Sequence, residues 1–382
     1  MPTFEPSGPR NRLFFDPTSF RAGVVTCGGL CPGINDVIRA LVMVLHHRYG
    51  VAHLEGYRYG YEGLNPACGH PVLTLDPQRV ERIHETGGTI LGSSRGPQDV
   101  ATMVDYLQSR RINALFVIGG DGTLRGGHEI ALEAIRRDAN ISVIGIPKTI
   151  DNDIMFIDQS FGFQTAFTKA VDAIAAAHIE AKGAPNGVGL VKLMGRHSGF
   201  IAAHAGLANN DPNYVLIPEV NFPLDGDGGL LEHLRRRLAA RGHAVIVAAE
   251  GAGQCYCQAE GADRSGNRAL GDIGLFLRER INEHMCSHNV PVNIKYIDPS
   301  YMIRGVPATP HDSVYCFQLA ADAAHAAMAG RTDMVIGKHH GRFVHIPIAT
   351  CVRQRQQLDP EGDLWQSVLE ATGQPHWPAA GE

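Results

Sequence analysis

The sequence lacks the long apolar run that a membrane-spanning helix needs. None of its 382 residues falls in a stretch that approaches roughly 20 consecutive apolar positions. Met1 to Phe20 carries scattered Pro and Arg residues where a signal peptide would have an apolar core. Low-complexity tracts are absent as well, which excludes a mainly disordered chain. We therefore expect a folded cytoplasmic protein with no membrane partner.

Positive charge is also scarce. The formal net charge is -5, with 34 Lys and Arg against 39 Asp and Glu. The one basic run, Arg235-Arg236-Arg237, is predicted to form the polar face of a helix rather than part of a nucleic-acid groove. We expect no nucleic-acid partner, and a phosphorylated ligand would have to be held by local cations.

The eight cysteines show no spacing typical of a disulfide framework. Cys27 with Cys31, and Cys255 with Cys257, could each form half of a metal site, but no His/Cys pair is placed to complete a zinc site. A chain of this length can build a sufficient core without disulfides. The cysteines are therefore interpreted as reduced, structural thiols.

Glycine is abundant, with 44 residues, and many glycines follow short apolar runs. Continuous apolar runs are typical of parallel strands covered on both faces, and a strand, a glycine turn and a helix are the parts of a βαβ unit. The predicted fold class is α/β, with two doubly wound Rossmann-like domains and largely parallel sheets. Such sheets bind ligands beyond the carboxyl ends of their strands. Five loops are predicted at such ends: Cys27–Gly33, Gly119–Thr123, Pro147–Asp153, Met194–Arg196 and Glu250–Gly253.

The loop Gly119–Thr123 has the features of a phosphate-binding turn. Its glycines let backbone N–H groups approach phosphate oxygens, and the helix that follows offers its positive N-terminus. Asp121 is placed to hold Mg²⁺ against those phosphates. A plain tight turn is the alternative, and diacylglycerol and NAD kinases carry a similar GGDGT motif.

The segment Lys148–Asp153 follows the next predicted strand. Asp151 and Asp153 lie two residues apart, and a phosphoryl acceptor hydroxyl needs a nearby carboxylate to take its proton. Lys148 could neutralise charge on the transferring group. The alternative is a helix N-cap, for which Asp and Asn are favoured. The position one loop after a phosphate-type motif favours the catalytic interpretation.

Further charged residues follow other predicted strands. Arg196 suits a phosphate or a developing charge, and Glu250 suits sugar hydroxyls. The alternatives are a surface ion pair for Arg196 and a solvated strand end for Glu250. A pocket for a phosphate monoester is predicted from Lys295, Tyr301 and Arg304, with Arg95 as a further phosphate clamp. Tyrosines such as Tyr301 are equally typical of half-buried packing.

Together these motifs resemble the 6-phosphofructokinase family, in the family's own order, from about Ala22 to Pro347. The wording of Gly28–Asp36, Lys192–Arg196 and Lys295–Ser300 is most similar to the plant-type ATP-using branch, which is related to the pyrophosphate-using enzymes. The resemblance implies a homodimer or homotetramer with the active site in a cleft between two domains. The implied domains are a donor domain of residues 22–163 plus 305–350, a sugar-phosphate domain of residues 164–304, and terminal extensions of residues 1–21 and 351–382.

The resemblance implies phosphoryl transfer from MgATP to the 1-hydroxyl of fructose 6-phosphate, with Asp151 as the general base. It implies donor binding by Gly28, Arg95, Gly96, Gly120, Asp121, Gly122 and Thr123, with Asp121 on Mg²⁺. It implies catalysis by Lys148, Thr149, Asp151, Asp153 and Arg196. It implies sugar-phosphate binding by Thr149, Ile150, Asp151, Met194, Gly195, Arg196, Glu250, Lys295, Tyr301 and Arg304.

The sequence departs from the family pattern in the 6-phosphate pocket. Gly187 stands where the family has an arginine that reaches a neighbouring subunit's site. Lys295 and Tyr301 stand where many bacterial enzymes have Arg and His. These departures leave the chemical core, with Asp121 and Asp151, untouched.

The phosphoryl donor depends on two positions. Gly122 leaves room for the α-phosphate of ATP, where pyrophosphate-using members usually carry Asp. Lys148 is typical of the pyrophosphate-using members, and the plant-type ATP enzymes combine both features. ATP is therefore favoured, with pyrophosphate as the alternative. A non-catalytic sugar-phosphate-binding paralogue would be expected to lose its base, and Asp151 is present.

Overall fold

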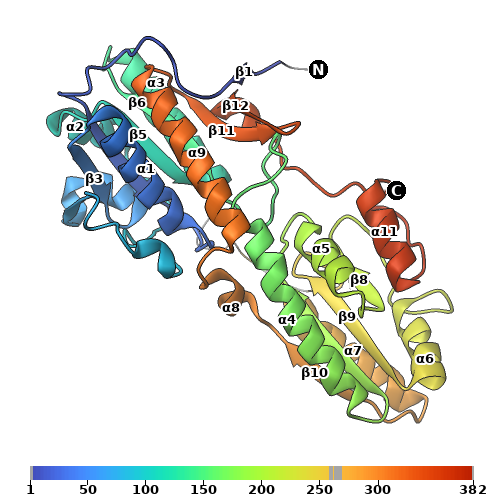
Figure 1. Ribbon diagram of the computed structural model, residues 1–382. Helices are drawn as coiled ribbons and strands as arrows, with labels where there is room; N and C mark the ends of the chain where they lie inside the picture. Colours follow the sequence, from blue (N-terminus) through green and yellow to red (C-terminus); the bar gives the residue numbers. More distant parts are fainter. Residues whose placement is uncertain (1–2, 258–260, 262–268, 381–382) are drawn as a thin grey trace. The chain divides into compact units, whose positions relative to one another are not determined.

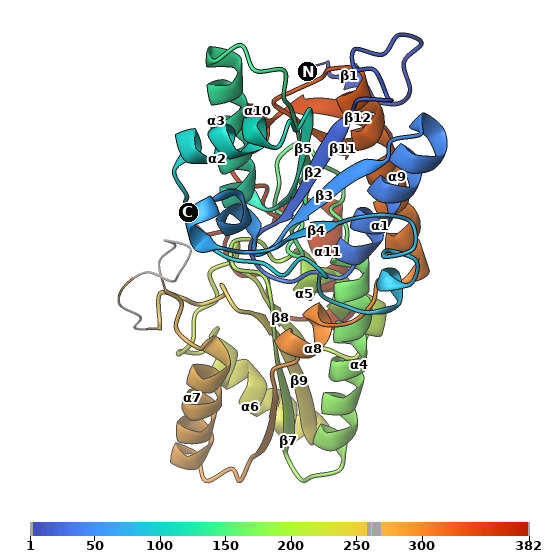
Figure 2. The same cartoon turned by 90° about the vertical axis from the view of Figure 1, so that its left-hand side faces the viewer.

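The computed structural model describes residues 3–257, 261 and 269–380. The chain forms two compact units (Figures 1 and 2). The first unit is Met1–Thr165 with Arg304–Arg355, and the second is Ala166–Ile303 with Gln356–Glu382. The C-terminal residues, treated above as an extension, are thus divided between the two units.

The first unit is built on an eight-stranded sheet in the order β1-β12-β11-β6-β5-β2-β3-β4. The five strands from β11 to β3 run parallel, whereas β1, β12 and β4 pair antiparallel with their neighbours. The strands are β1 (Glu5–Pro6), β2 (Arg21–Thr26), β3 (His53–Tyr57), β4 (Val72–Thr74), β5 (Ala114–Gly119), β6 (Ser142–Pro147), β11 (Met334–His339) and β12 (Arg342–Pro347).

Helices cover both faces of this sheet, as Figure 2 shows. α1 (Ile34–Tyr49) and α9 (Pro310–Met328) bury apolar side chains on one face, and α2 (Val100–Ser109) and α3 (Asp121–Arg136) on the other. Every residue of β5 and β6 is buried, which explains their continuous apolar sequences. The remaining short helices are η1 (Gly60–Leu64), η2 (Pro66–Cys68), η3 (Ile83–Glu85) and α10 (Ile348–Cys351).

The second unit has a four-stranded, wholly parallel sheet in the order β10-β7-β9-β8. Figure 2 shows α4 and α7 on opposite sides of its strands. The strands are β7 (Gly187–Leu193), β8 (Tyr214–Leu216), β9 (His243–Ala249) and β10 (Asn293–Ile297). The helices are α4 (Phe163–Lys182), α5 (Phe200–Asn209), α6 (Leu230–Arg241), α7 (Ile273–Ser287), α8 (Ser300–Arg304) and α11 (Asp363–Thr372). α4 and α8 begin in one unit and end in the other.

The predicted α/β architecture is confirmed, and so is the placement of the basic run Arg235-Arg236-Arg237 on a helix, α6. The N-terminal residues, treated above as a terminal extension, contribute a strand to the first sheet. Glu5–Pro6 adds β1 to the edge of the first sheet by pairing with His345 and Val344 of β12. A two-residue strand is too short to show a period in the sequence, so this pairing had no local signal.

Two further properties bear on function. All eight cysteines are free thiols, and burial raises the pKa of both Cys27 and Cys31 to about 12, which keeps those two protonated and unreactive. Among the described residues, no helix combines the length and the apolar character required to cross a bilayer.

Candidate active site

Two of the predicted loops lie side by side at the carboxyl ends of β5 and β6. Gly119 pairs with Pro147 in the parallel register, and the N–H of Lys148 donates to the carbonyl oxygen of Gly119 at 2.9 Å. Gly120 is the N-cap of α3, so the helix begins immediately beside Lys148. The phosphate-type loop and the acidic loop therefore form one continuous edge of the first unit.

The glycines of the first loop have different roles. A Cβ atom on Gly119 would overlap the side chain of Thr123, so the turn requires glycine there. A Cβ atom on Gly122 would meet no heavy atom of the described chain within 4 Å. The first turn of α3 therefore has open space above Gly122, where its free backbone N–H groups can receive a phosphate.

A cluster of cations surrounds the neighbouring loop after β2. The buried Lys148 donates from Nζ to the carbonyl oxygen of Gly29 at 2.6 Å. The guanidinium groups of Arg95 and Arg304 also lie close to this loop. A Cβ atom placed on Gly29 would be 3.6 Å from Nη2 of Arg95 and 3.8 Å from Nη1 of Arg304. Burial, together with these two arginines, lowers the pKa of Lys148. Such a concentration of positive charge is suited to a polyanionic ligand.

The acidic loop is held in shape by its own side chains. The hydroxyl of Thr149 donates to Oδ1 of Asp153 at 2.7 Å and accepts from the N–H of Asp151 at 3.2 Å. Asn152 adopts a left-handed conformation with φ of 57°, and its Oδ1 accepts from the N–H of Ser160 at 2.7 Å. These contacts fix the backbone that carries Asp151, which is a requirement for a positioned base.

Ile150 contributes differently from its polar neighbours. Its partly buried side chain packs against the core cluster of the first unit. A role in sugar-phosphate binding would therefore involve its backbone.

Arg355 is a site residue that the sequence analysis missed. Its Nη1 lies 2.7 Å from Oδ2 of Asp153, and its Nε lies 3.7 Å from Oδ2 of Asp121. Burial raises the pKa of Asp121, while Arg355 and Arg125 oppose that rise. Arg355 thus bridges the two carboxylates of adjacent loops. It lies more than 200 positions along the chain from either loop, so no local sequence motif indicated its role.

The implied Mg²⁺ can be tested against these residues. Asp121 supplies a hard carboxylate oxygen at the start of α3, with its side chain only 16% exposed. Asp153 is close enough to raise the pKa of Asp121 by charge repulsion. Two neighbouring carboxylates in a shielded position form a donor set that a divalent cation neutralises. The residues present therefore fit Mg²⁺.

In the second unit, two predicted loops meet at the carboxyl ends of β7 and β9. The N–H of Glu250 donates to Leu193 at 2.8 Å, and the N–H of Gly251 donates to Gly195 at 3.0 Å. A Cβ atom on Gly251 would overlap the carbonyl oxygen of Arg196. Met194, Gly195 and Arg196 thus lie directly beside Glu250, and their common role in binding a sugar phosphate stays a prediction.

Glu219 supports this edge and was also missed from the sequence. Its buried Oε1 accepts from the N–H groups of Gly199 at 2.9 Å and Leu358 at 2.8 Å. Burial raises the pKa of this carboxyl, and the backbone donors oppose the rise. Glu219 therefore anchors the chain shortly after Arg196 to the C-terminal segment.

The predicted 6-phosphate residues are spread over both units. Lys295 lies within β10 opposite Gly189, and its Nζ is 3.9 Å from Oε2 of Glu180 on α4. Tyr301 is 84% exposed on α8. Arg304 belongs to the first unit, near Gly29 as described above. Their common role in holding a 6-phosphate stays a prediction.

Gly187, where the family has an arginine, begins β7. A Cβ atom there would overlap the carbonyl oxygen of Ala181. A side chain at this position would therefore require the backbone of this chain to shift.

Known proteins are similar to this chain over most of its length. The sequence profile of the phosphofructokinase family matches residues 21–327. An ATP-dependent 6-phosphofructokinase from Amycolatopsis methanolica is 53% identical over 98% of this chain and 83% of its own length. The ATP-dependent 6-phosphofructokinase of Borreliella burgdorferi is 50% identical over 97% of this chain and 85% of its own. ATP-dependent 6-phosphofructokinase 7 of Arabidopsis thaliana is 46% identical over 97% of this chain and 77% of its own.

Solved structures share the fold. The pyrophosphate-dependent phosphofructokinase from Marinobacter aquaeolei aligns with a TM-score of 0.75 over 93% of this chain and 91% of its own, at 18% identity. That identity supports the fold alone. With the profile match and relatives near 50% identity, the chain belongs to the phosphofructokinase family.

Proposed function

We propose that this protein transfers the γ-phosphoryl group of MgATP to the 1-hydroxyl of fructose 6-phosphate, giving fructose 1,6-bisphosphate and ADP. The observation that carries the proposal is the junction of the β5 and β6 loops. It joins a helix N-terminus with open space to a rigid acidic loop and a buried lysine. The ATP-dependent 6-phosphofructokinases at 53% and 50% identity support the same activity.

In the proposed reaction Asp151 takes the proton of the 1-hydroxyl. The hydroxyl oxygen forms a bond to the γ-phosphorus as the bond to the β,γ-bridging oxygen breaks, and ADP leaves. Thr149 holds the loop through its contacts with Asp151 and Asp153. Lys148 offsets charge on the transferring group, and the start of α3 binds donor oxygens.

Asp121 is the residue that we assign to Mg²⁺, which when bound would offset the charge of the donor phosphates. Arg355 orients Asp153 through an ion pair and interacts electrostatically with Asp121. For the acceptor we assign the edge of the second unit, with Glu250 on sugar hydroxyls and Arg196 on the transferring group. Lys295, Tyr301 and Arg304 are assigned to the 6-phosphate on the family resemblance.

The proposed donor is ATP rather than pyrophosphate. The open space above Gly122 supports this choice, because an Asp at that position would fill it and repel the α-phosphate. The names of the relatives near 50% identity support it too. From the family resemblance we also propose a cytoplasmic homodimer or homotetramer.

The test is to identify the product. Purified protein is incubated with fructose 6-phosphate, Mg²⁺ and ATP, and the mixture is followed by phosphorus NMR. We expect ADP and a second phosphomonoester on the C1 oxygen to form together, and neither to form without the sugar phosphate. ATP hydrolysis that is independent of the sugar, or the absence of any new ester, would contradict the proposal.

A further inference from the structure

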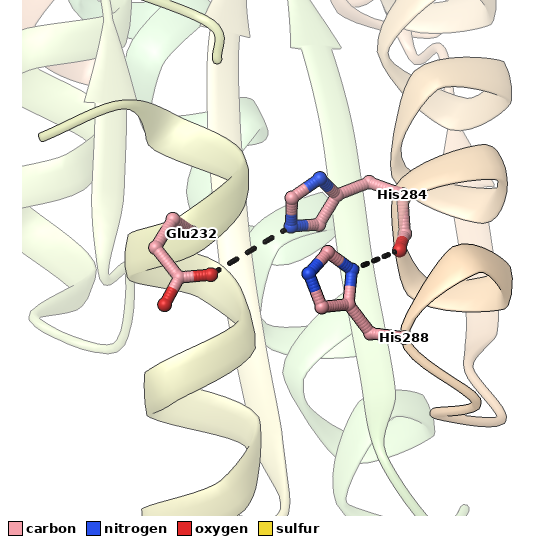
Figure 3. Close-up of side chains that lie close together, drawn as sticks. All are labelled: Glu232, His284 and His288. Atoms are coloured by element: carbon pink, nitrogen blue, oxygen red, sulfur yellow. Dashed lines mark hydrogen bonds and ion pairs between the residues drawn. The ribbon is translucent and has the colours of Figure 1, made fainter. Parts of the chain in front are cut away.

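Two helices of the second unit bring together three side chains that no step of the proposed reaction uses. Glu232 lies on α6, and His284 and His288 lie on the last turn of α7 and just after it. One carboxylate oxygen and two ring nitrogens lie within 4.8 Å of one another (Figure 3). The histidines are four residues apart, which places them on one face of a helix.

The ring of His288 is already oriented as a ligand would be. Its Nδ1 lies 2.8 Å from the carbonyl oxygen of His284, and because a carbonyl only accepts, Nδ1 carries the hydrogen. The lone pair of the neutral ring is then on Nε2, which Figure 3 shows turned toward Glu232. A ring nitrogen that donates to a backbone carbonyl while the other faces the ion is the usual arrangement of a metal-binding histidine.

The Nε2 atom of His284 is a second feature that favours a bound cation. It is shielded from solvent and makes no hydrogen bond within the part of the chain that the structure describes. It lies 3.8 Å from Oε2 of Glu232, too far for a hydrogen bond. A shielded polar atom in this state costs free energy, which a coordinated cation between the two atoms would recover.

The charge around Glu232 permits a cation. Arg235 donates to both oxygens of this carboxylate, at 2.8 and 2.7 Å, and Arg236 donates to one of them at 3.0 Å. The ion pairs that include Glu232 join two carboxylates, Glu232 and Asp227, to two guanidinium groups, Arg235 and Arg236, and so carry no net positive charge. A separate group joins Arg280 to Asp225 and Glu283 and has one negative charge in excess.

We propose that Glu232, His284 and His288 bind a divalent transition-metal ion, with Zn²⁺ as the best match. Two imidazole nitrogens and one carboxylate oxygen suit Zn²⁺, and a water would complete four-fold coordination. The bound ion links α6 to α7 and stabilises the second unit against unfolding. This site is separate from the residues assigned to Mg²⁺, the donor or the sugar phosphate, so its test does not depend on the proposed phosphoryl transfer.

The experiment measures Zn²⁺ binding to the chelator-treated full-length protein by competition with a chromophoric chelator. We expect one Zn²⁺ per chain at this site. His284→Gln and His288→Gln should each weaken binding by at least about 10-fold, since even outer-shell changes at zinc sites have effects of that size. Zn²⁺ should also raise the unfolding temperature of the parent protein but not of either variant.

Cys286→Ser is the matched control, because this exposed thiol lies between the two histidines but two positions from each, off their face of α7. It should bind Zn²⁺ as the parent does. His288 is exposed, so His288→Gln tests the ligand without disturbing the core. A parent that binds no Zn²⁺, histidine variants that bind it unchanged, or loss of binding in Cys286→Ser would each overturn the assignment.

Discussion

Glycines follow the strands of both units, but the space around them differs. In the first unit, a Cβ atom on Gly122 would meet nothing within 4 Å, and one on Gly28 would meet only Nζ of Lys148, at 3.7 Å. In the second unit, a Cβ atom on Gly195 would lie 2.6 Å from the carbonyl oxygen of Ser198, and one on Gly251 would overlap that of Arg196. The first pair leaves space for a ligand, whereas the second allows close backbone packing, within one loop at Gly195 and between two loops at Gly251.

The difference teaches that a glycine after a strand does not by itself indicate a ligand. Substitutions at the two edges should therefore have separable effects. Changes at Gly122 and Asp151 of the first edge should alter catalysis and leave stability nearly unchanged. Changes at the glycines of the second edge should reduce stability.

The largest effect is expected from Asp151→Asn, which removes the proposed base from the first edge. Loss of general-base catalysis should lower kcat by between about 10² and 10⁴-fold. Steady-state kinetics with saturating MgATP and fructose 6-phosphate measures this change. The denaturation midpoint should stay near that of the parent, and a variant with parental kcat would exclude Asp151 as the base.

Gly251→Ala should have the largest effect on stability. The added methyl group overlaps the backbone of Arg196, so the two loops must move apart, at a cost of about 3 kcal/mol. Denaturant unfolding measures this change in the free energy of unfolding. Gly228→Ala is the control, since its Cβ would meet nothing within 4 Å, and it should stay within about 0.5 kcal/mol of the parent. Equal stabilities for the two variants would contradict the packing role of Gly251.

Gly122→Asp should have the opposite effects from Gly251→Ala, reducing activity with ATP and leaving stability intact. An acid in the first turn of α3 is compatible with the helix, so stability should hold or rise slightly. The added charge should repel the donor and lower kcat/KM for ATP by about 30-fold, or about 2 kcal/mol. Gly122→Ala separates bulk from charge and should keep most of the activity. Unchanged ATP kinetics in Gly122→Asp would show that this space does not receive the donor.

The smallest expected effect is a fall in kcat/KM for ATP at alkaline pH, seen as a descending limb of the pH profile. Burial lowers the pKa of Lys148 below the ordinary lysine value, so the free enzyme loses this positive charge as pH rises through the lowered pKa. Between the folded and unfolded pKa values the unfolded chain holds the extra proton, so this group makes folding more favourable as pH rises there. Lys148→Met should remove the limb. A limb that persists in that variant would assign it to another group.

Many residues at the carboxyl edge of the first sheet were predictable from the sequence. Apolar runs such as Ala114–Gly119 are fully buried parallel strands, and the polar residues directly after them must lie at the carboxyl edge. That local rule is sufficient for Asp121, Lys148 and Asp151, because each follows its strand by a few residues.

Residues brought in from distant segments were not predictable in this way. Arg355 reaches Asp153 from 202 positions away, and Glu219 accepts from Leu358, 139 positions away. Neither residue lies in a glycine-rich turn or a periodic element that would indicate its partner. The joining of Gln356–Glu382 to the second unit likewise depends on tertiary packing.

The most direct test of the central claim compares ATP with pyrophosphate as donors for the unaltered protein, with fructose 6-phosphate and Mg²⁺ held constant. If the open space above Gly122 receives the α-phosphate, kcat/KM for ATP should exceed that for pyrophosphate by at least about 10²-fold, or about 2.7 kcal/mol. Equal or faster turnover with pyrophosphate would contradict the claim and would show that Lys148, rather than Gly122, decides the donor.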